Sequence, residues 1–159
     1  MCIRDRRKCP AVGGADEREW AVSQQFVHQA EDVYKALVAK QPTLYETDKV
    51  SKEALAEWWA GDDRTLHNRK QGLQVHLALL EAAAAATPGK AGYLTRDGKS
   101  VGECKFWATL HTLVMIKSDV LAPFPALTAF YERFGGEEAT KRVVDSGGRF
   151  PGPLKQYLS

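Results

Sequence analysis

The sequence predicts an all-α protein: a helical bundle of five main helices and one short extra helix. Three observations lead to this prediction. Apolar residues recur every three to four positions over most of the chain, which is the period of an amphipathic helix. Clusters of proline and glycine separate these periodic segments. No segment shows a convincing alternation of apolar and polar residues, so we expect no β-strand.

The chain of 159 residues is long enough for one domain with a core of its own. We expect residues 1–14 to be a leader and linker, residues 15–146 the helical domain, and residues 147–159 a tail. The leader begins MCIRDRR, without periodicity or a helix cap. It looks like translated sequencing adapter, and a disordered basic tail is the alternative. If it is adapter, the natural chain continues on its N-terminal side.

The composition narrows the classes of function. Apolar residues make up 44% and charged residues 26%, as in an ordinary soluble protein. The net charge of +2 comes from interspersed charges, so we expect no nucleic-acid partner. The odd number of cysteines, without CxxC spacing, favours a reducing, cytoplasmic environment. No signal sequence is visible. The four histidines have no metal spacing, so we expect no metal.

Residues 15–40 form the first predicted helix. Its first turn carries acids, which the helix dipole favours. Its buried stripe is expected to be Val22, Phe26, Ala30, Val33 and Leu37. Residues 51–60 form the short extra helix. One of its two adjacent tryptophans, Trp58 or Trp59, should pack on the core, and the other should be half exposed. Residues 64–86 form the next helix, with an apolar stripe of Leu66, Leu73, Leu77 and Leu80.

The segment Lys99–Pro125 should contain the central helix of the fold. Ser100 and Glu103 have the spacing of a capping box, in which each side chain accepts a hydrogen bond from the other residue's backbone N–H. The helix that follows is apolar nearly all round, which predicts a position inside the bundle. Lys105, His111 and Lys117 interrupt it, so we expect no membrane span. Cys104 is interpreted as an inert core thiol, and His111 as a core histidine with a satisfied nitrogen. Residues 126–134 and 137–145 complete the bundle.

This organisation resembles the C-terminal helical domain of cytosolic glutathione transferases of the sigma, pi and alpha-like branch. Three stretches carry the resemblance: Ala30–Val33, an apolar-acid-Asp-apolar segment; Tyr93–Glu103, with the capping box; and Leu121–Leu127, with its Phe-Pro pair before a helix. The resemblance covers roughly residues 15–146. It implies a cytoplasmic homodimer that conjugates glutathione, as co-substrate, to small apolar electrophiles in detoxification.

The sequence departs from the family in several places. Lys99 replaces the apolar residue that usually precedes the cap, and Arg96 replaces a loop glycine. The connection at residues 43–63 is longer than usual. Only Met1–Gly14 precedes the first helix, whereas family members carry a thioredoxin-like domain there. Because that domain binds most of the glutathione and supplies the residue that activates its thiol, we expect this chain alone to contain no catalytic residue and to be inactive.

The resemblance places the remaining site residues on the first helix. An acid that reaches across the dimer to the γ-glutamyl ammonium corresponds to Gln24, whose neutral amide would bind more weakly. A solvated helix glutamine is the preferred interpretation of this residue. Asp32 is a second candidate glutathione contact. The competing interpretation is a solvent-facing residue that pairs with Lys35. Tyr34 and Val38 correspond to the electrophile pocket, although Tyr34 is equally interpreted as a boundary residue. Asp32 and Tyr34 lie about 200° apart around a helix and cannot serve one site.

Two classes of function therefore remain. The first is the helical domain of a glutathione transferase. The second is a non-catalytic interaction module of the same fold, like those that dock proteins in translation factors and tRNA-synthetase complexes. The absence of an acid at Gln24 mildly favours the second class. A generic helical bundle with accidental similarity is a third, weaker hypothesis.

Overall fold

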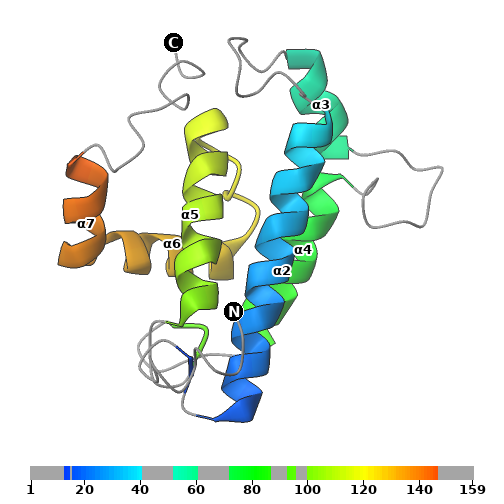
Figure 1. Ribbon diagram of the computed structural model, residues 1–159. Helices are drawn as coiled ribbons and strands as arrows, with labels where there is room; N and C mark the ends of the chain where they lie inside the picture. Colours follow the sequence, from blue (N-terminus) through cyan, green and yellow to red (C-terminus); the bar gives the residue numbers. More distant parts are fainter. Residues whose placement is uncertain are drawn as a thin grey trace.

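The computed structural model describes residues 13–14, 16–40, 52–60, 72–86, 93–95 and 100–146; within these, the side chains of residues 37–40 and 52–55 are left out of the description. The described part of the chain contains six helices and no strand, which confirms the all-α prediction. The helices are α2 (Glu17–Lys40), α3 (Lys52–Ala60), α4 (Leu73–Ala86), α5 (Val101–Ile116), α6 (Pro125–Gly135) and α7 (Glu138–Asp145) (Figure 1).

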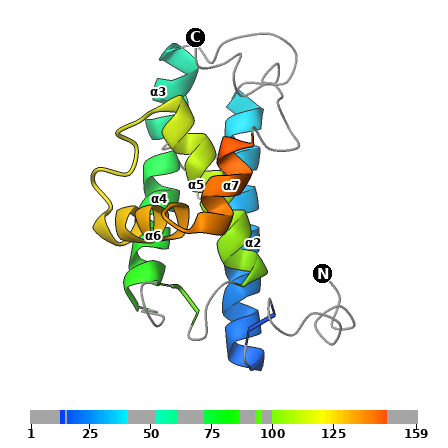
Figure 2. The ribbon, with the colours of Figure 1, turned by 90° about the vertical axis from the view of Figure 1, so that its left-hand side faces the viewer.

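Three helices set the long axis of the molecule. Helices α2, α4 and α5 run along this axis, and α3 continues it at one end (Figure 1). Helix α6 runs across them, as the turned view shows (Figure 2). Helix α7 lies on the side of α5 that faces away from α4 (Figure 1). Helix α5 therefore lies between the α2–α4 pair and the α7 end of the chain.

The helix boundaries follow the local sequence signals closely. Helix α2 begins at Glu17, where the Asp16 side chain accepts a hydrogen bond of 2.9 Å from the backbone N–H of Glu19. Helices α6 and α7 begin and end within one residue of their predicted limits. Helix α4 begins at Leu73, so Gly72, which was predicted to be helical, instead precedes the helix, and its carbonyl accepts from the N–H groups of Val75 and His76; the predicted helical residues 64–71 lie outside the described residues. Residues 1–12 of the predicted leader and linker (residues 1–14) and the predicted tail of residues 147–159 also lie outside them.

The core is built from the predicted apolar stripes. Of the residues predicted for α2 and α4, those with described side chains are buried or half-buried; Leu37 and Leu66 lie outside the described side chains. Helix α5 adds Phe106, Leu110 and Leu113, which are also buried. Rings at the centre stack directly, with Phe106 5.2 Å from Phe26 and 5.5 Å from Phe130. These contacts join α2, α5 and α6 into one core.

Helix α5 is less enclosed than its apolar sequence predicts. Its buried side faces α2 and α6, whereas Cys104 lies on the opposite, exposed side. The prediction of a core thiol at Cys104 is therefore wrong. The reason is that the other helices cover only one side of α5. Cys104 lies on the uncovered side and is therefore exposed to solvent.

The two adjacent tryptophans of α3 divide as expected. Trp58 is buried, with 3% of its surface exposed, and Trp59 is half-buried. The Lys117 ammonium lies 5.8 Å from the Trp59 ring centre, which is within the range of a cation–π contact. The segment therefore has a packing role that links α3 to the end of α5.

Helix α6 takes its N-terminal cap from another helix. Phe124 occupies the cap position and provides no side-chain hydrogen bond. Instead, the Glu81 carboxylate of α4 accepts hydrogen bonds of 2.8 Å and 2.9 Å from the backbone N–H groups of Ala126 and Leu127. A negative charge also suits the positive end of the helix dipole. Glu81 thus fixes the start of α6 on α4.

Candidate functional site

The predicted capping box of α5 is present and forms the centre of a larger network. Ser100 Oγ accepts from the Glu103 backbone N–H at 3.3 Å, and Glu103 Oε2 accepts from the Ser100 N–H at 2.7 Å. The Glu103 side chain is fully buried. It also accepts from the backbone N–H groups of Leu94 and Thr95 at 2.6 Å and 3.1 Å, and from the Thr95 hydroxyl at 2.8 Å. Glu103 is therefore a structural carboxylate with four buried donors, and it carries no chemistry.

The helix start is also fixed to α2. Ser23 Oγ accepts a hydrogen bond of 2.9 Å from the Gly102 backbone N–H. A Cβ added at Gly102 would lie 2.1 Å from the Ser23 carbonyl oxygen, so the two backbones approach as closely as glycine allows. This contact fixes the position of α2 against the start of α5.

Gln24 follows Ser23 on α2 and is half-buried. Its Nε2 atom is buried and has no hydrogen-bond partner. The interpretation as a fully solvated glutamine is therefore wrong. An unpaired buried amide is unusual in a folded protein, because such a group loses its hydrogen bonds to water. The unpaired atom is a donor, so it is not the atom that could accept a hydrogen bond from an ammonium group.

Asp32 and Tyr34 lie near the other end of α2, and both are half-buried. Lys35 forms its ion pair with Glu31 at 3.8 Å, so the predicted Asp32–Lys35 pair is wrong. The Lys105 ammonium lies 3.3 Å from Glu31 and 5.7 Å from the centre of the Tyr34 ring. Tyr34 thus borders a charged contact between α2 and α5.

The predicted site residues do not meet at one point. Gln24 and Tyr34 are ten residues apart on α2, which separates them by about 15 Å along the helix. Asp32 and Tyr34 point to different sides of the same helix, as expected. The side chain of Val38 lies outside the described residues. The predicted site residues with described side chains therefore lie at separate places on α2 and do not line one pocket.

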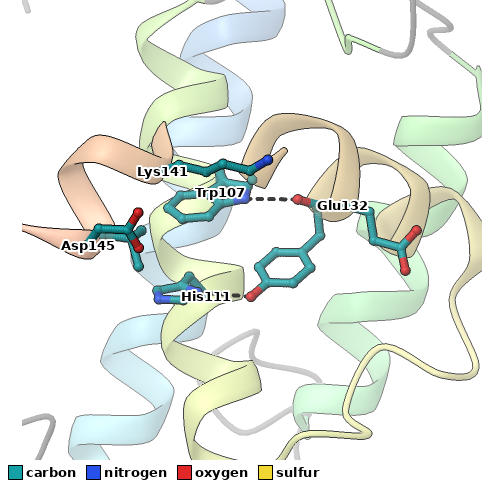
Figure 3. Close-up of a pocket in the computed structure, with 8 residues that line it drawn as sticks. Trp107, His111, Glu132, Lys141 and Asp145 are labelled. Carbon is teal, nitrogen blue, oxygen red and sulfur yellow. Dashed lines mark hydrogen bonds between the residues drawn. The ribbon is translucent and has the colours of Figure 1, made fainter. Parts of the chain in front are cut away.

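The structure also contains a hollow that the sequence reasoning did not predict. It lies where α5, α6 and α7 meet and has a volume of about 260 Å³ (Figure 3). Its lining combines aromatic rings with charged side chains: Trp107, His111, Tyr131, Glu132, Gly135, Lys141, Val144 and Asp145.

The aromatic wall of the hollow consists of three nearly parallel rings. Trp107 stacks on His111 at 4.9 Å between ring centres and 10° between planes, and on Tyr131 at 5.8 Å and 12°. His111 and Tyr131 are 6.1 Å apart at 22°. Two hydrogen bonds fix the rings: Trp107 Nε1–H donates to the Tyr131 carbonyl at 3.0 Å, and His111 Nδ1 lies 2.9 Å from the Tyr131 hydroxyl (Figure 3). The wall is therefore rigid.

Burial perturbs both titratable groups of this wall. It lowers the pKa of His111 from the ordinary value of 6.5, because the charged imidazolium loses water. It raises the pKa of Tyr131 above 10.0 for the same reason, since the phenolate is disfavoured. Both groups are consequently neutral near pH 7. The predicted satisfied nitrogen of His111 is confirmed, but the residue is half-buried at the hollow rather than in the core.

Part of this hollow could have been predicted from the sequence. Trp107 and His111 are four residues apart and so share one face of a helix. Tyr131, Lys141 and Asp145 come from later helices, and only the crossing of α6 over α5 brings them to this face. That crossing is a tertiary property, which a helical period does not encode.

No group of three or more metal-binding side chains gathers anywhere in the part of the chain that the structure describes. Among the same residues, no helix is long and apolar enough to cross a membrane. Comparisons of the chain with models of protein families, with curated proteins and with solved structures find no significant match.

Proposed function

We propose that this chain is the C-terminal-type helical domain of a glutathione transferase. In the intact protein it would work with a thioredoxin-like domain, as a cytoplasmic homodimer, to conjugate glutathione to small apolar electrophiles. The order of helices supports this proposal: a long first helix, a capped central helix, and a next helix that begins at Phe124–Pro125.

The observation that carries the proposal is the environment of Glu103. The family resemblance rests on a capping box in front of a buried central helix. Here both hydrogen bonds of the box form, and the carboxylate also accepts from Leu94 and Thr95 in the preceding loop. A capping box at the N-terminus of an exposed helix would leave its glutamate in contact with solvent. The network favours a domain in which this loop and helix act as one unit.

The chemistry assigned to this domain is supportive rather than catalytic. In the proposed transferase, the glutathione thiolate attacks an electrophile, and the thiol-activating residue belongs to the thioredoxin-like domain. Gln24 would accept a hydrogen bond from the γ-glutamyl ammonium of glutathione bound to the partner subunit. Asp32 is a less favoured second contact. Tyr34, with Val38 one turn further on, would form part of the electrophile pocket.

The direct test begins with the messenger RNA upstream of the codon for Lys8. We expect it to encode a thioredoxin-like βαβ unit in frame. The longer protein should then conjugate glutathione to a chlorinated aromatic substrate, while the present chain alone should not. An untranslated region or stop codon at that point would contradict the proposal for the gene. Clear turnover by the present chain would contradict the assignment of the activating residue to the other domain.

A second experiment uses the longer protein to test the role of Gln24. Replacement by aspartate offers a carboxylate to the ammonium, and charge-assisted hydrogen bonds are roughly twice as strong as neutral ones. Gln24→Asp should therefore tighten glutathione binding by about fivefold in a calorimetric titration. The control is Ala129→Asp, which adds the same carboxylate at an exposed position of α6, away from α2. Equal effects of both variants would remove Gln24 from the glutathione site.

One observation suits a protein contact, which the first proposal and the second candidate, a non-catalytic interaction module, would both use. Val75 and Leu79 on α4 are exposed to 38% and 56%, although both are large apolar residues. Leu79 also borders a small hollow of about 210 Å³ between α2 and α4, lined by Gln25, Phe26, Gln29, Leu80 and Ala83. Exposed apolar groups beside a hollow are typical of a protein-contact surface. This surface would serve a homodimer in the first proposal and a different protein in the second.

A further inference from the structure

We propose that the hollow between α5, α6 and α7 binds a planar aromatic cation of one or two fused rings. The proposal concerns a site separate from Gln24 and Tyr34 on α2, and it does not depend on the glutathione transferase proposal. Three features of the hollow carry it: the parallel rings, the size, and the charges at the rim.

The parallel rings favour a flat ligand. Trp107, His111 and Tyr131 keep their planes within 22° of one another, so a planar molecule in the hollow can lie parallel to all three. Offset stacking between aromatic rings is favourable beyond the area that it buries. Hydrogen bonds already hold the three rings in place, so a ligand would lose little free energy in ordering them.

Gly135 lies against the edge of the Trp107 ring, which is itself largely buried. A Cβ at this position would lie 3.4 Å from the Cζ2 and Nε1 atoms of the indole, in ordinary contact with it. Any larger side chain would extend over the ring. The volume of about 260 Å³ lies just below the usual range for pockets of drug-sized ligands, which limits the occupant to one or two fused rings.

The charges at the rim favour a cation. Glu132 of α6 and Asp145 of α7 lie on opposite sides of the rings, and Lys141 lies at the rim between them (Figure 3). All three side chains are exposed, and none forms an ion pair with another described residue. A cation above an indole ring gains a cation–π interaction and here meets two carboxylates and one amine. An anion would have the same two carboxylates and one amine around it, a net negative rim.

The inner wall adds no positive charge that would oppose such a ligand. His111 is the only titratable cation of the aromatic wall, and burial lowers its pKa, so the imidazole is neutral near pH 7. Its Nδ1 atom lies within hydrogen-bond distance of the Tyr131 hydroxyl, and Trp107 stacks on its ring, so the imidazole is held as part of the wall. The hollow therefore combines a neutral aromatic wall with a net acidic rim.

Three probes of the same shape test the proposal: N-methylquinolinium, quinoline and naphthoate, which are cationic, neutral and anionic near pH 7. Each is titrated into the full chain, and the indole N–H signals are followed by NMR; the Trp107→Phe variant assigns the Trp107 signal. We expect N-methylquinolinium to shift that signal saturably, quinoline more weakly and naphthoate least. The absence of a saturable shift with any probe would overturn the site. Equal affinity for all three would overturn the preference for a cation.

A pair of rim variants separates this site from general electrostatic attraction. The double variant Glu132→Gln with Asp145→Asn should weaken N-methylquinolinium binding by about fivefold and leave quinoline binding unchanged. The control is Glu138→Gln, which removes an exposed acid from α7 outside the hollow and should leave both unchanged. These exposed, isosteric changes should not disturb folding, which circular dichroism can verify. If Glu138→Gln weakened cation binding as much as the double variant, the rim carboxylates would have no role in recognition.

Discussion

Glu103 is a carboxylate without any solvent exposure, and its four donors account for its stability there. The Ser100 N–H was predictable, because a capping box involves residues three positions apart. The donors from Leu94 and Thr95 were not predictable, since their position depends on how the preceding loop turns back onto α5. Sequence spacing thus predicted the cap but not the burial of its acid.

Replacing this carboxylate should be costly. In Glu103→Gln the amide retains one oxygen acceptor and turns an NH₂ group toward buried donors. Hydrogen bonds to charged groups contribute about 1.5–3 kcal/mol each, so we expect a loss of roughly 2–4 kcal/mol in the free energy of unfolding. Ser100→Ala should cost about 0.5–2 kcal/mol. Urea denaturation followed by circular dichroism measures both values.

The control for Glu103→Gln is the same change at Glu132, which is exposed on α6. Exposed substitutions usually change stability by less than about 0.5 kcal/mol. If Glu103→Gln were as stable as Glu132→Gln, the buried network would not contribute to stability. If Ser100→Ala had no effect, the capping box would not form in solution.

The titration of His111 should be visible in the pH dependence of stability. Burial lowers the pKa of His111 below 6.5 in the folded chain, so the unfolded chain takes up this proton first as the pH falls. The contribution of the neutral imidazole is therefore complete above pH 6.5 and is lost as the pH falls toward the pKa of the folded state. NMR titration of the imidazole measures that pKa directly, and a value of 6.5 or higher would contradict the prediction.

The Tyr131→Phe variant identifies the cause of the shift. It removes the hydroxyl that lies 2.9 Å from His111 Nδ1 but keeps the ring that buries the imidazole. Because burial is the cause, the pKa of His111 should stay low in this variant. A return to the ordinary value would show that the hydrogen bond, and not the loss of water, lowers it.

At the scale of elements, the close approach of α2 and α5 at Gly102 fixes the geometry of the bundle. A glycine in the first turn of a helix is an unremarkable sequence feature and predicts no contact. Its reason appears only in the structure, where the Ser23 carbonyl occupies the space of a Cβ. The sequence predicted both helices and their apolar faces, but it did not identify the point at which their backbones touch.

Gly102→Ala should therefore destabilise the protein. The added methyl group would lie 2.1 Å from a backbone oxygen, so α2 and α5 would have to separate. Overpacking of this kind typically costs 1–3 kcal/mol, and backbone contact places this variant at about 3 kcal/mol. Gly135→Ala is the matched control, because the nearest atom to its Cβ is 3.4 Å away. Thermal denaturation should rank the two variants clearly; equal melting temperatures would show that the helices are not held this closely.

At the start of α6, the sequence predicts the position of the helix but not the residue that caps it. The Phe124–Pro125 pair predicted the position at which the helix begins, because proline suits the first helical turn. The acid that caps this turn comes from Glu81, 45 residues before Ala126. Local cap signals cannot reveal such a partner, since Glu81 looks like an ordinary helix residue within α4.

At the scale of the whole molecule, the apolar residues predict where the core lies but not which apolar residues stay outside it. Leu77 and Leu80 are buried, whereas Leu79 on the same helix is 56% exposed. The period of α4 separates these faces, but it does not show whether a second chain covers Leu79. The oligomeric state is therefore a property that must be measured.

We expect Leu79 to lie in the proposed dimer interface. Light scattering should show a dimer for the natural sequence and a monomer for Leu79→Asp, because a buried unpaired carboxylate opposes association. Val143→Asp is the control: Val143 is 63% exposed, but it lies on α7 and outside this surface. A monomeric natural chain, or dissociation by Val143→Asp alone, would contradict the use of the α4 surface.

The cap that Glu81 provides for α6 also bears on how the chain reaches its fold. Closing a loop of 45 residues costs conformational entropy that a cap within the helix would not cost. The first turn of α6 consequently gains its acceptor only after α4 is in place. A peptide that contained α6 and α7 alone would lack this acceptor, and its helix would begin with exposed N–H groups. We therefore expect α6 to order late, after the longer helices have assembled.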